Sequence, residues 1–259
     1  MGEGIVQFLE TWSPIDVVLI AQNFDRFLLG AWVTLELTVL SLIIGGSLAV
    51  PLAIIRAGKN PIFNGPVWLF TYTFRGTPLL VQTYLIYYGL GQFEWIRESM
   101  MWGPVLSQAW WCALIAFSLN TAAYTTELLR GAIETTNRGE VEAAKACGFS
   151  RRMRMRRIVL PSAFRRALPA YSNEVIFMLH GSVVASTITI QDLLGVGRWL
   201  NGRYYLAYEG FITAAVLYFI IVLIVARGFR FWEKHWLQHL YPREALEVKP
   251  AKGSASFRI

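Results

Sequence analysis

The sequence lacks the residue patterns on which most catalytic and metal sites are built. It has only two cysteines, Cys112 and Cys147, which exclude a disulfide framework and a cysteine-based metal site. No G-x-x-x-x-G-K-[ST] segment and no Ser/His/Asp or Cys/His set is evident, so neither a P-loop nor a nucleophilic site is expected. His235 and His239 are spaced i, i+4 but have no acidic ligand placed beside them. We therefore predict that the chain is not an enzyme and itself binds no metal and no cofactor.

Charged residues are also scarce, at 16% of the chain, whereas 55% of the residues are hydrophobic and the mean hydropathy is +0.43. About 20 apolar residues suffice to cross the roughly 30 Å hydrocarbon core of a bilayer. The sequence therefore predicts an all-α integral membrane protein with five transmembrane helices and one membrane domain. The spans are expected around the segments that contain no Asp, Glu, Lys or Arg: Leu37–Ile55, Gly76–Phe93, Ser99–Thr126, Val175–Gln191 and Gly210–Ala226.

The distribution of charge predicts the topology. The first 25 residues carry acidic groups and no basic group, unlike the start of a signal peptide. Nine Lys or Arg residues and only two carboxylates lie between Arg138 and Arg166, which places this segment in the cytoplasm by the positive-inside rule. Basic residues beside spans favour anionic lipid headgroups over nucleic acid as the partner of this chain, whose pI is about 9.6. We expect the N-terminus outside and the C-terminus inside.

These observations predict three regions along the chain. Residues 1–25 form an extracytoplasmic tail, residues 26–240 form the transmembrane domain with a cytoplasmic loop at 131–161, and residues 241–259 form a cytoplasmic tail. Between the fourth and fifth spans, the charges of Asp192, Arg198, Arg203 and Glu209 predict an outer loop.

The basic loop contains the signals of a short helix. Asn137 followed by Glu140 is typical of a capping box at the start of a helix. Gly148 predicts that the helix ends at a glycine in the left-handed backbone conformation. Between them, Ala143 and Ala144 have small side chains that allow another backbone to approach closely. Two interpretations stay open: a docking element for a soluble partner, or a solvated loop that sets topology by its charge.

The second span is expected to be broken. A continuous helix from Pro61 to Gln92 would measure about 48 Å, which is too long for one perpendicular crossing. We predict an interfacial or tilted helix over Ile62–Phe74, a break at the Arg-Gly-Thr-Pro segment that contains Arg75 and Thr77, and a second helix over Leu79–Gln92. Arg75 either has a structural role or lines a transport path.

Polar side chains also occur within later spans. Asn120 and Tyr124 share one helical face, where they either are satisfied locally or contact water or substrate. Glu174, with Asn173 beside it, lies between apolar residues, and a carboxylate there must face a partner or a water-filled cavity. The alternatives are an internal ion pair, with Arg75 or Arg165, and a substrate path. The residues expected on the face of Glu174 are Phe177, Met178 and Gly181.

The sequence resembles the permease subunits of ABC importers, in particular those for polar amino acids of the histidine, lysine-arginine-ornithine and opine type. The resemblance covers roughly residues 30–240 and rests on several separate segments. The matching segments are Glu142-Ala143-Ala144 with Gly148 and Ile158, Leu160 and Pro161 (the EAA signature), Phe74-Arg75-Gly76-Thr77-Pro78-Leu79, and the stretch from Leu160 to Glu174.

The resemblance implies a type I ABC importer permease fold in the bacterial inner membrane. It implies an assembly with two ATP-binding subunits that hold ATP and Mg²⁺, a second permease subunit that is a paralogue, and a periplasmic solute-binding protein. The cargo would be a polar or basic amino acid or an opine, moved by alternating access. Coupling to the ATPases is implied for Glu142, Ala143, Ala144 and Gly148. The expected substrate path comprises Arg75, Thr77, Asn120, Tyr124, Asn173 and Glu174.

Two functions from other classes are alternatives to this one. A secondary transporter or channel driven by an ion gradient usually shows internal repeats, and no convincing repeat relates the five predicted spans. A membrane scaffold that recruits a cytoplasmic enzyme would need the basic loop but not Asn120, Asn173 and Glu174 inside the bilayer. Copurification with an ATP-binding protein distinguishes an importer subunit from both.

Overall fold

The computed structural model describes residues 17–58 and 60–237, and these residues form helices and no strands. The α-helices are α2 (Val17–Gln22), α3 (Phe24–Arg56), α4 (Pro61–Gly76), α5 (Leu79–Tyr84), α6 (Glu94–Arg97), α7 (Ala109–Glu134), α8 (Arg138–Ala146), α9 (Arg151–Arg154), α10 (Leu160–Gly181), α11 (Leu193–Tyr204) and α12 (Ala207–Leu237). The π- and 3₁₀-helical segments are η1 (Leu85–Gly89), η2 (Leu90–Gln92), η3 (Trp102–Leu106), η4 (Met155–Val159) and η5 (Ser182–Ile188).

By length and composition, α3 and α12 can each cross a membrane within the described residues, with mean hydropathies of 2.2 and 2.4. The helices over Arg151–Ile188 and Leu193–Tyr204 pass the same test as a pair bent by 42°. The two remaining predicted spans correspond to the broken segment α5–η1–η2 and to α7, whose N-terminal end is apolar and whose C-terminal end carries charged residues. The helical membrane fold is confirmed.

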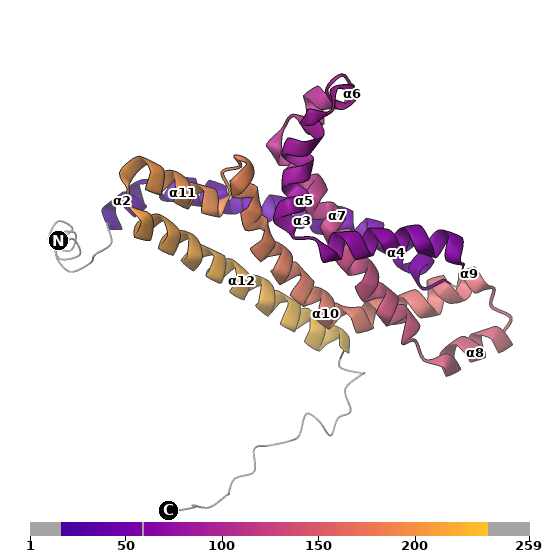
Figure 1. The fold of residues 1–259 in the computed structure, drawn as a ribbon. Coiled ribbons are helices and arrows are strands. Elements are labelled where there is room, and N and C mark those ends of the chain that lie inside the picture. Colours follow the sequence, from indigo (N-terminus) through magenta and orange to yellow (C-terminus); the bar gives the residue numbers. More distant parts are fainter. Residues whose placement is uncertain (1–16, 59, 238–259) are drawn as a thin grey trace, which may run out of the picture.

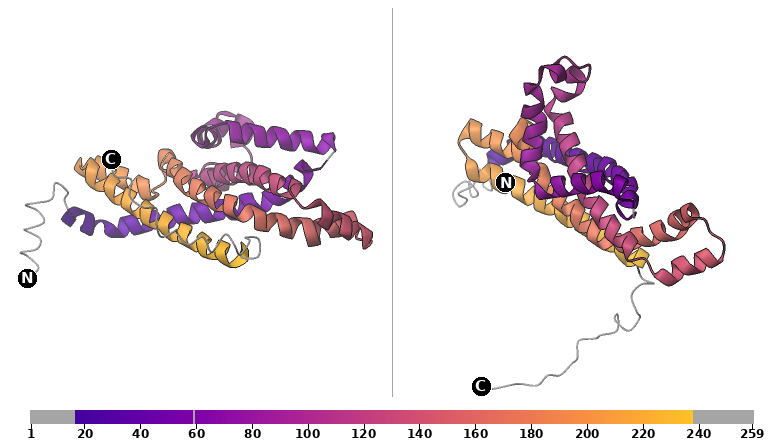
Figure 2. Two further views of the ribbon diagram at one scale, coloured as in Figure 1. Left: turned by 90° about the horizontal axis from the view of Figure 1, so that it is seen from below. Right: turned by 45° about the vertical axis from the view of Figure 1, so that its right-hand side comes forward.

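The two ends of the molecule are well separated along its long axis (Figures 1 and 2). Helix α11 and the start of α3 lie at one end, whereas α8 and α9 lie at the other, and α12 runs beside α10 from the first end toward the second. The segment around α5 and α6 projects from the body. The predicted tails fall largely on residues 1–16 and 238–259, outside the described residues, and α2 occupies part of the predicted N-terminal tail.

Helices α3 and α7 form the most extensive contact in the fold. A Cβ atom at Gly45 would lie 2.6 Å from the backbone oxygen of Ser118 and 2.7 Å from the Cβ atom of Thr121, so only glycine allows this approach. Small residues permit such close packing between membrane helices. At Gly46, by contrast, the nearest atom is the hydroxyl of Tyr171 at 3.5 Å, because this glycine faces a cavity.

The predicted outer loop at residues 192–209 is largely helical, because α11 occupies most of it, and its side of the membrane stays a prediction. The Asp192 carboxylate caps this helix by accepting from the backbone N–H of Gly195 at 2.8 Å, and it also accepts from the hydroxyl of Tyr218 on α12 at 3.2 Å. Asp192 is fully buried. Because Asp192 is charged, the sequence predicted that it faces solvent. Its carboxylate instead accepts a hydrogen bond from a free backbone N–H at the start of α11 and joins this helix to α12.

Candidate functional site

Helix α8 has the local signals that the sequence predicted. The side-chain oxygen of Asn137 accepts a hydrogen bond from the backbone N–H of Gly139 at 2.9 Å, so Asn137 is the N-cap, although its bond goes to Gly139 rather than to Glu140. At the other end, the N–H of Phe149 reaches the oxygen of Ala144 at 3.0 Å and Gly148 adopts a φ of +77°. This pair of features is a Schellman stop, in which glycine takes the left-handed position without strain.

The four residues implied in coupling do not all face the same way. Glu142, Ala143 and Gly148 are exposed, whereas Ala144 is buried against the rest of the chain. A Cβ atom at Gly148 would meet no atom within 4 Å. The outer surface of α8 is therefore open to a partner beside small side chains, while Ala144 anchors the helix. Its role in coupling stays a prediction.

The break between α4 and α5 is confirmed, and a buried amide that no sequence pattern indicated stabilises it. Gln82 is 6% exposed, and its Nε2 group donates to the backbone oxygens of Phe74 at 2.7 Å and Thr77 at 3.0 Å. Its Oε1 atom accepts from Nδ2 of Asn120 on α7 at 3.0 Å. Pro78 has no N–H to satisfy the carbonyls at the end of α4, so the Gln82 side chain supplies the donor.

Gln82→Leu is expected to loosen this break, because leucine fills a similar volume but leaves the carbonyls of Phe74 and Thr77 without this donor. A buried hydrogen-bond partner that is lost costs about 1–3 kcal/mol. We expect a lower midpoint of thermal unfolding for the purified protein. The matched control is Gln92→Leu, since the amide of Gln92 makes one weak bond of 3.5 Å at an exposed position. Equal midpoints for the two variants would contradict the role assigned to Gln82.

Five of the six residues expected in the substrate path lie around two adjacent cavities. The first has a volume of about 390 Å³ and is lined by side chains that include Thr77, Asn120, Tyr124 and Glu174. The second, of about 330 Å³, adds Arg75 and shares Tyr124 and Glu174 with the first. The three residues predicted on the Glu174 face, Phe177, Met178 and Gly181, also line the first cavity.

The sixth residue, Asn173, is exposed and lines neither of these cavities. Consecutive residues of an α-helix point about 100° apart, so Glu174 and Asn173 on α10 do not share a face. Asn120 combines both interpretations that the sequence left open, because it lines the first cavity and also donates to Gln82.

The Glu174 carboxylate makes no ion pair within 4.0 Å and no hydrogen bond among the described residues. Arg75 shares the second cavity with it, but the Arg75 guanidinium lies over the ring of Tyr124, 5.4 Å from its centroid. Arg165 lines a different cavity. The internal ion pair considered from the sequence is therefore not formed, and the carboxylate faces the cavities instead.

A second acidic residue, Glu127, joins several helices near the C-terminal end of α7. Its Oε1 atom accepts from Nε of Arg56 on α3 at 2.8 Å and from the hydroxyl of Thr71 on α4 at 3.0 Å. Its Oε2 atom accepts from Nε of Arg130 at 2.7 Å. This network joins three helices and forms part of the wall of the second cavity. The only sequence signal was the position of Glu127 directly after an uncharged span.

Comparison with known proteins identifies the family of this chain. Residues 49–236 match the family described as the binding-protein-dependent transport system inner membrane component. The chain belongs to this family. Among its permease relatives is the histidine/lysine/arginine/ornithine transport system permease protein HisM of Escherichia coli (strain K12), with 46% identity over 90% of this chain and 96% of the relative. The octopine transport system permease protein OccM of Rhizobium radiobacter is 45% identical over 85% of this chain and 89% of the relative.

Solved structures of permeases confirm the predicted ABC importer fold. A crystal structure of an amino acid ABC transporter with histidines aligns with a TM-score of 0.76 and 29% identity, covering 85% of this chain and 99% of that chain. The MetNI methionine ABC transporter in an inward-facing conformation aligns with a TM-score of 0.66 and 16% identity, covering 85% and 99%. The second likeness concerns the fold alone. The permease fold therefore positions both α8 and the cavities beside Glu174.

Proposed function

We propose that this permease is the membrane-spanning subunit of an ATP-driven importer for a polar or basic amino acid or an opine. The observation that carries the proposal is the unpaired Glu174 carboxylate at two cavities, with Arg75 at the second. An unpaired carboxylate inside a bilayer is costly unless it serves a ligand or a water-filled path. It provides a site for the cationic group of the substrate, and Arg75 provides one for a carboxylate. The named substrates of HisM and OccM support this choice of cargo.

The proposed assembly contains two ATP-binding subunits that hold ATP and Mg²⁺, a paralogous second permease subunit and a periplasmic solute-binding protein. Closure of the ATPases on ATP would move the exposed surface of α8, which carries Glu142 and Ala143. Because α8 contacts α9 and η4, and η4 continues into α10, this movement reaches the helix that bears Glu174. Closure would thus favour one of two packed states of the bundle, which is alternating access.

The test is uptake of labelled amino acids by vesicles that contain the reconstituted complex. The permease should copurify with an ATP-binding protein, and uptake of at least one polar or basic amino acid or opine should require ATP inside the compartment that α8 faces. A membrane potential or a sodium or proton gradient without ATP should drive no uptake. Uptake driven by a gradient alone would instead establish the secondary transporter that was considered from the sequence.

The orientation of the permease has a direct test in its two cysteines. Cys147 at the end of α8 is exposed, whereas Cys112 in α7 is fully buried. A membrane-impermeant maleimide should therefore label Cys147 in inside-out vesicles but not in intact cells, with Cys147→Ser as the unlabelled control. Labelling of Cys147 from outside in intact cells would contradict the cytoplasmic placement of α8, and with it the proposed docking of ATPases there.

A further inference from the structure

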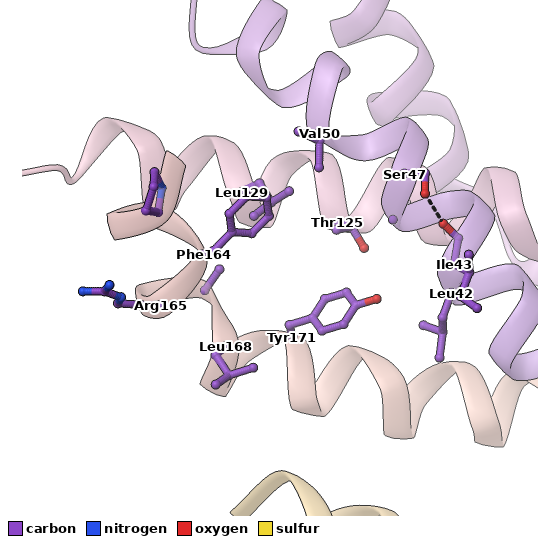
Figure 3. Close-up of a pocket in the computed structure, with 13 residues that line it drawn as sticks. Leu42, Ile43, Ser47, Val50, Thr125, Leu129, Phe164, Arg165, Leu168 and Tyr171 are labelled. Atoms are coloured by element: carbon purple, nitrogen blue, oxygen red, sulfur yellow. Dashed lines mark hydrogen bonds between the residues drawn. The ribbon is translucent and has the colours of Figure 1, made fainter. Parts of the chain in front are cut away.

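A third and larger cavity of about 720 Å³ lies between α3, α7 and α10 (Figure 3). It shares no lining residue with the two cavities beside Glu174. Apolar side chains form most of its wall, including Leu42, Val50, Leu129, Phe164 and Leu168, and no carboxylate lines it. A cavity of this character does not suit a cationic or zwitterionic amino acid, because nothing in it would replace the water around an ammonium group.

Two hydroxyl groups point into this apolar space. Thr125 is 2% exposed, and its Oγ1 atom has no hydrogen-bond partner among the described residues. The Tyr171 hydroxyl likewise makes no hydrogen bond there, and in Figure 3 both oxygens are directed toward the same part of the cavity. A buried hydroxyl without a partner, as at Thr125, is costly, and with the half-buried hydroxyl of Tyr171 beside it indicates a ligand that presents an oxygen acceptor at this depth.

A positive charge stands at one end of the cavity. The Arg165 side chain is exposed and has no ion pair or hydrogen bond among the described residues, and Figure 3 shows its guanidinium directed away from the aromatic rings. Its neighbour Arg166 differs, because it donates to the hydroxyl of Ser162 at 2.6 Å and of Thr136 at 2.7 Å. Arg166 is thus occupied within the fold, while Arg165 remains available to an anion.

We propose that this cavity binds one anionic phospholipid of the leaflet that faces α8. Its phosphate lies at Arg165, an ester carbonyl accepts from the hydroxyls of Thr125 and Tyr171, and an acyl chain occupies the apolar part toward Leu42. Arg165 and Tyr171 are six residues apart on α10, about 9 Å along the helix axis, within the reach of one lipid molecule. In Figure 3, Arg165 and Leu42 lie at opposite ends of the cavity, and the two hydroxyls lie between them. This is the order of headgroup, ester and chain end, and basic residues at this depth attract anionic headgroups.

The experiment uses the assembled transporter in vesicles that contain a trace of phosphatidylglycerol or phosphatidylcholine with a photoreactive acyl chain. After irradiation, mass spectrometry locates the labelled peptides. We expect phosphatidylglycerol to label α3 and α10 at this cavity more than phosphatidylcholine does. Arg165→Gln should lower the phosphatidylglycerol labelling about fivefold, the effect of one basic residue near an anionic surface, and leave that of phosphatidylcholine unchanged. Gly46→Leu, which places a side chain beside Tyr171, should lower both.

Arg227→Gln is the matched control, since Arg227 is an exposed basic residue on α12 that does not line the cavity. It should leave both labelling intensities unchanged. Equal labelling by the two lipids in the unaltered protein, or an unchanged preference in Arg165→Gln, would show ordinary bulk lipid and overturn the proposal. Cross-links from a photoreactive residue at position 171 to the second permease subunit, with no lipid labelling, would overturn it as well.

Discussion

Glu174→Gln is expected to lower the uptake of cationic amino acids by about ten- to a hundredfold and to affect neutral ones much less. The substitution keeps the shape of the side chain and removes its charge, and a hydrogen bond that involves an ionised group contributes about 1.5–3 kcal/mol. Because Glu174 makes no ion pair among the described residues, its loss should not unfold the bundle or separate the ATPase subunits. The measurement is uptake of labelled lysine and glutamine by the reconstituted complex, together with its rate of ATP hydrolysis.

Glu36→Gln provides the matched control for this experiment. Glu36 lies in α3, is partly buried, and lines none of the cavities described above. Its replacement removes the same charge from the membrane domain and should leave the ratio of lysine to glutamine uptake unchanged. If Glu174→Gln instead reduced both substrates equally, or prevented assembly, Glu174 would have a structural role and the proposed substrate site would be wrong.

Gly148→Asp is expected to abolish coupled transport while the permease itself remains folded. The φ of +77° at Gly148 is a conformation that side chains other than Asn and Asp rarely adopt. A Cβ atom there would meet nothing within 4 Å among the described residues, so the added side chain should leave the fold intact and a steric effect should come from a partner. We expect loss of the ATP-binding subunits on purification, or ATP hydrolysis without uptake. Copurification and uptake per ATP hydrolysed are the two quantities to measure.

Gly148→Asn separates the effect of side-chain size from the effect of charge, since asparagine and aspartate both tolerate the left-handed conformation but asparagine is neutral. If a tight interface surrounds this position, the asparagine variant should lose part of the coupling and the aspartate variant nearly all of it. Wild-type uptake and copurification in Gly148→Asp would exclude α8 as the docking element. The helix would then be the solvated loop that the sequence also allowed.

The sequence by itself determined the features that depend on neighbouring residues. Uncharged apolar runs determined the membrane spans, because the cost of burying charge in hydrocarbon acts residue by residue. Asn137 and Gly148 set the two ends of α8, since the hydrogen bonds of the N-cap and of the glycine C-terminus join residues within about one helical turn. Pro78 broke the second span for an equally local reason, the absence of its N–H. The two ends of α8 and the break after α4 are present in the structure at the predicted places.

Only the tertiary structure decided which polar groups become partners. Gln82 and Asn120 are separated by 38 residues, Arg56 and Glu127 by 71, so no local pattern pairs them. Glu174 could equally have formed an ion pair, and only the packing of α10 against α7 leaves its carboxylate at the cavities. A buried polar group takes whichever partner the packing of helices brings within hydrogen-bond distance. That choice depends on the whole bundle, whereas the helices themselves depend on the local sequence.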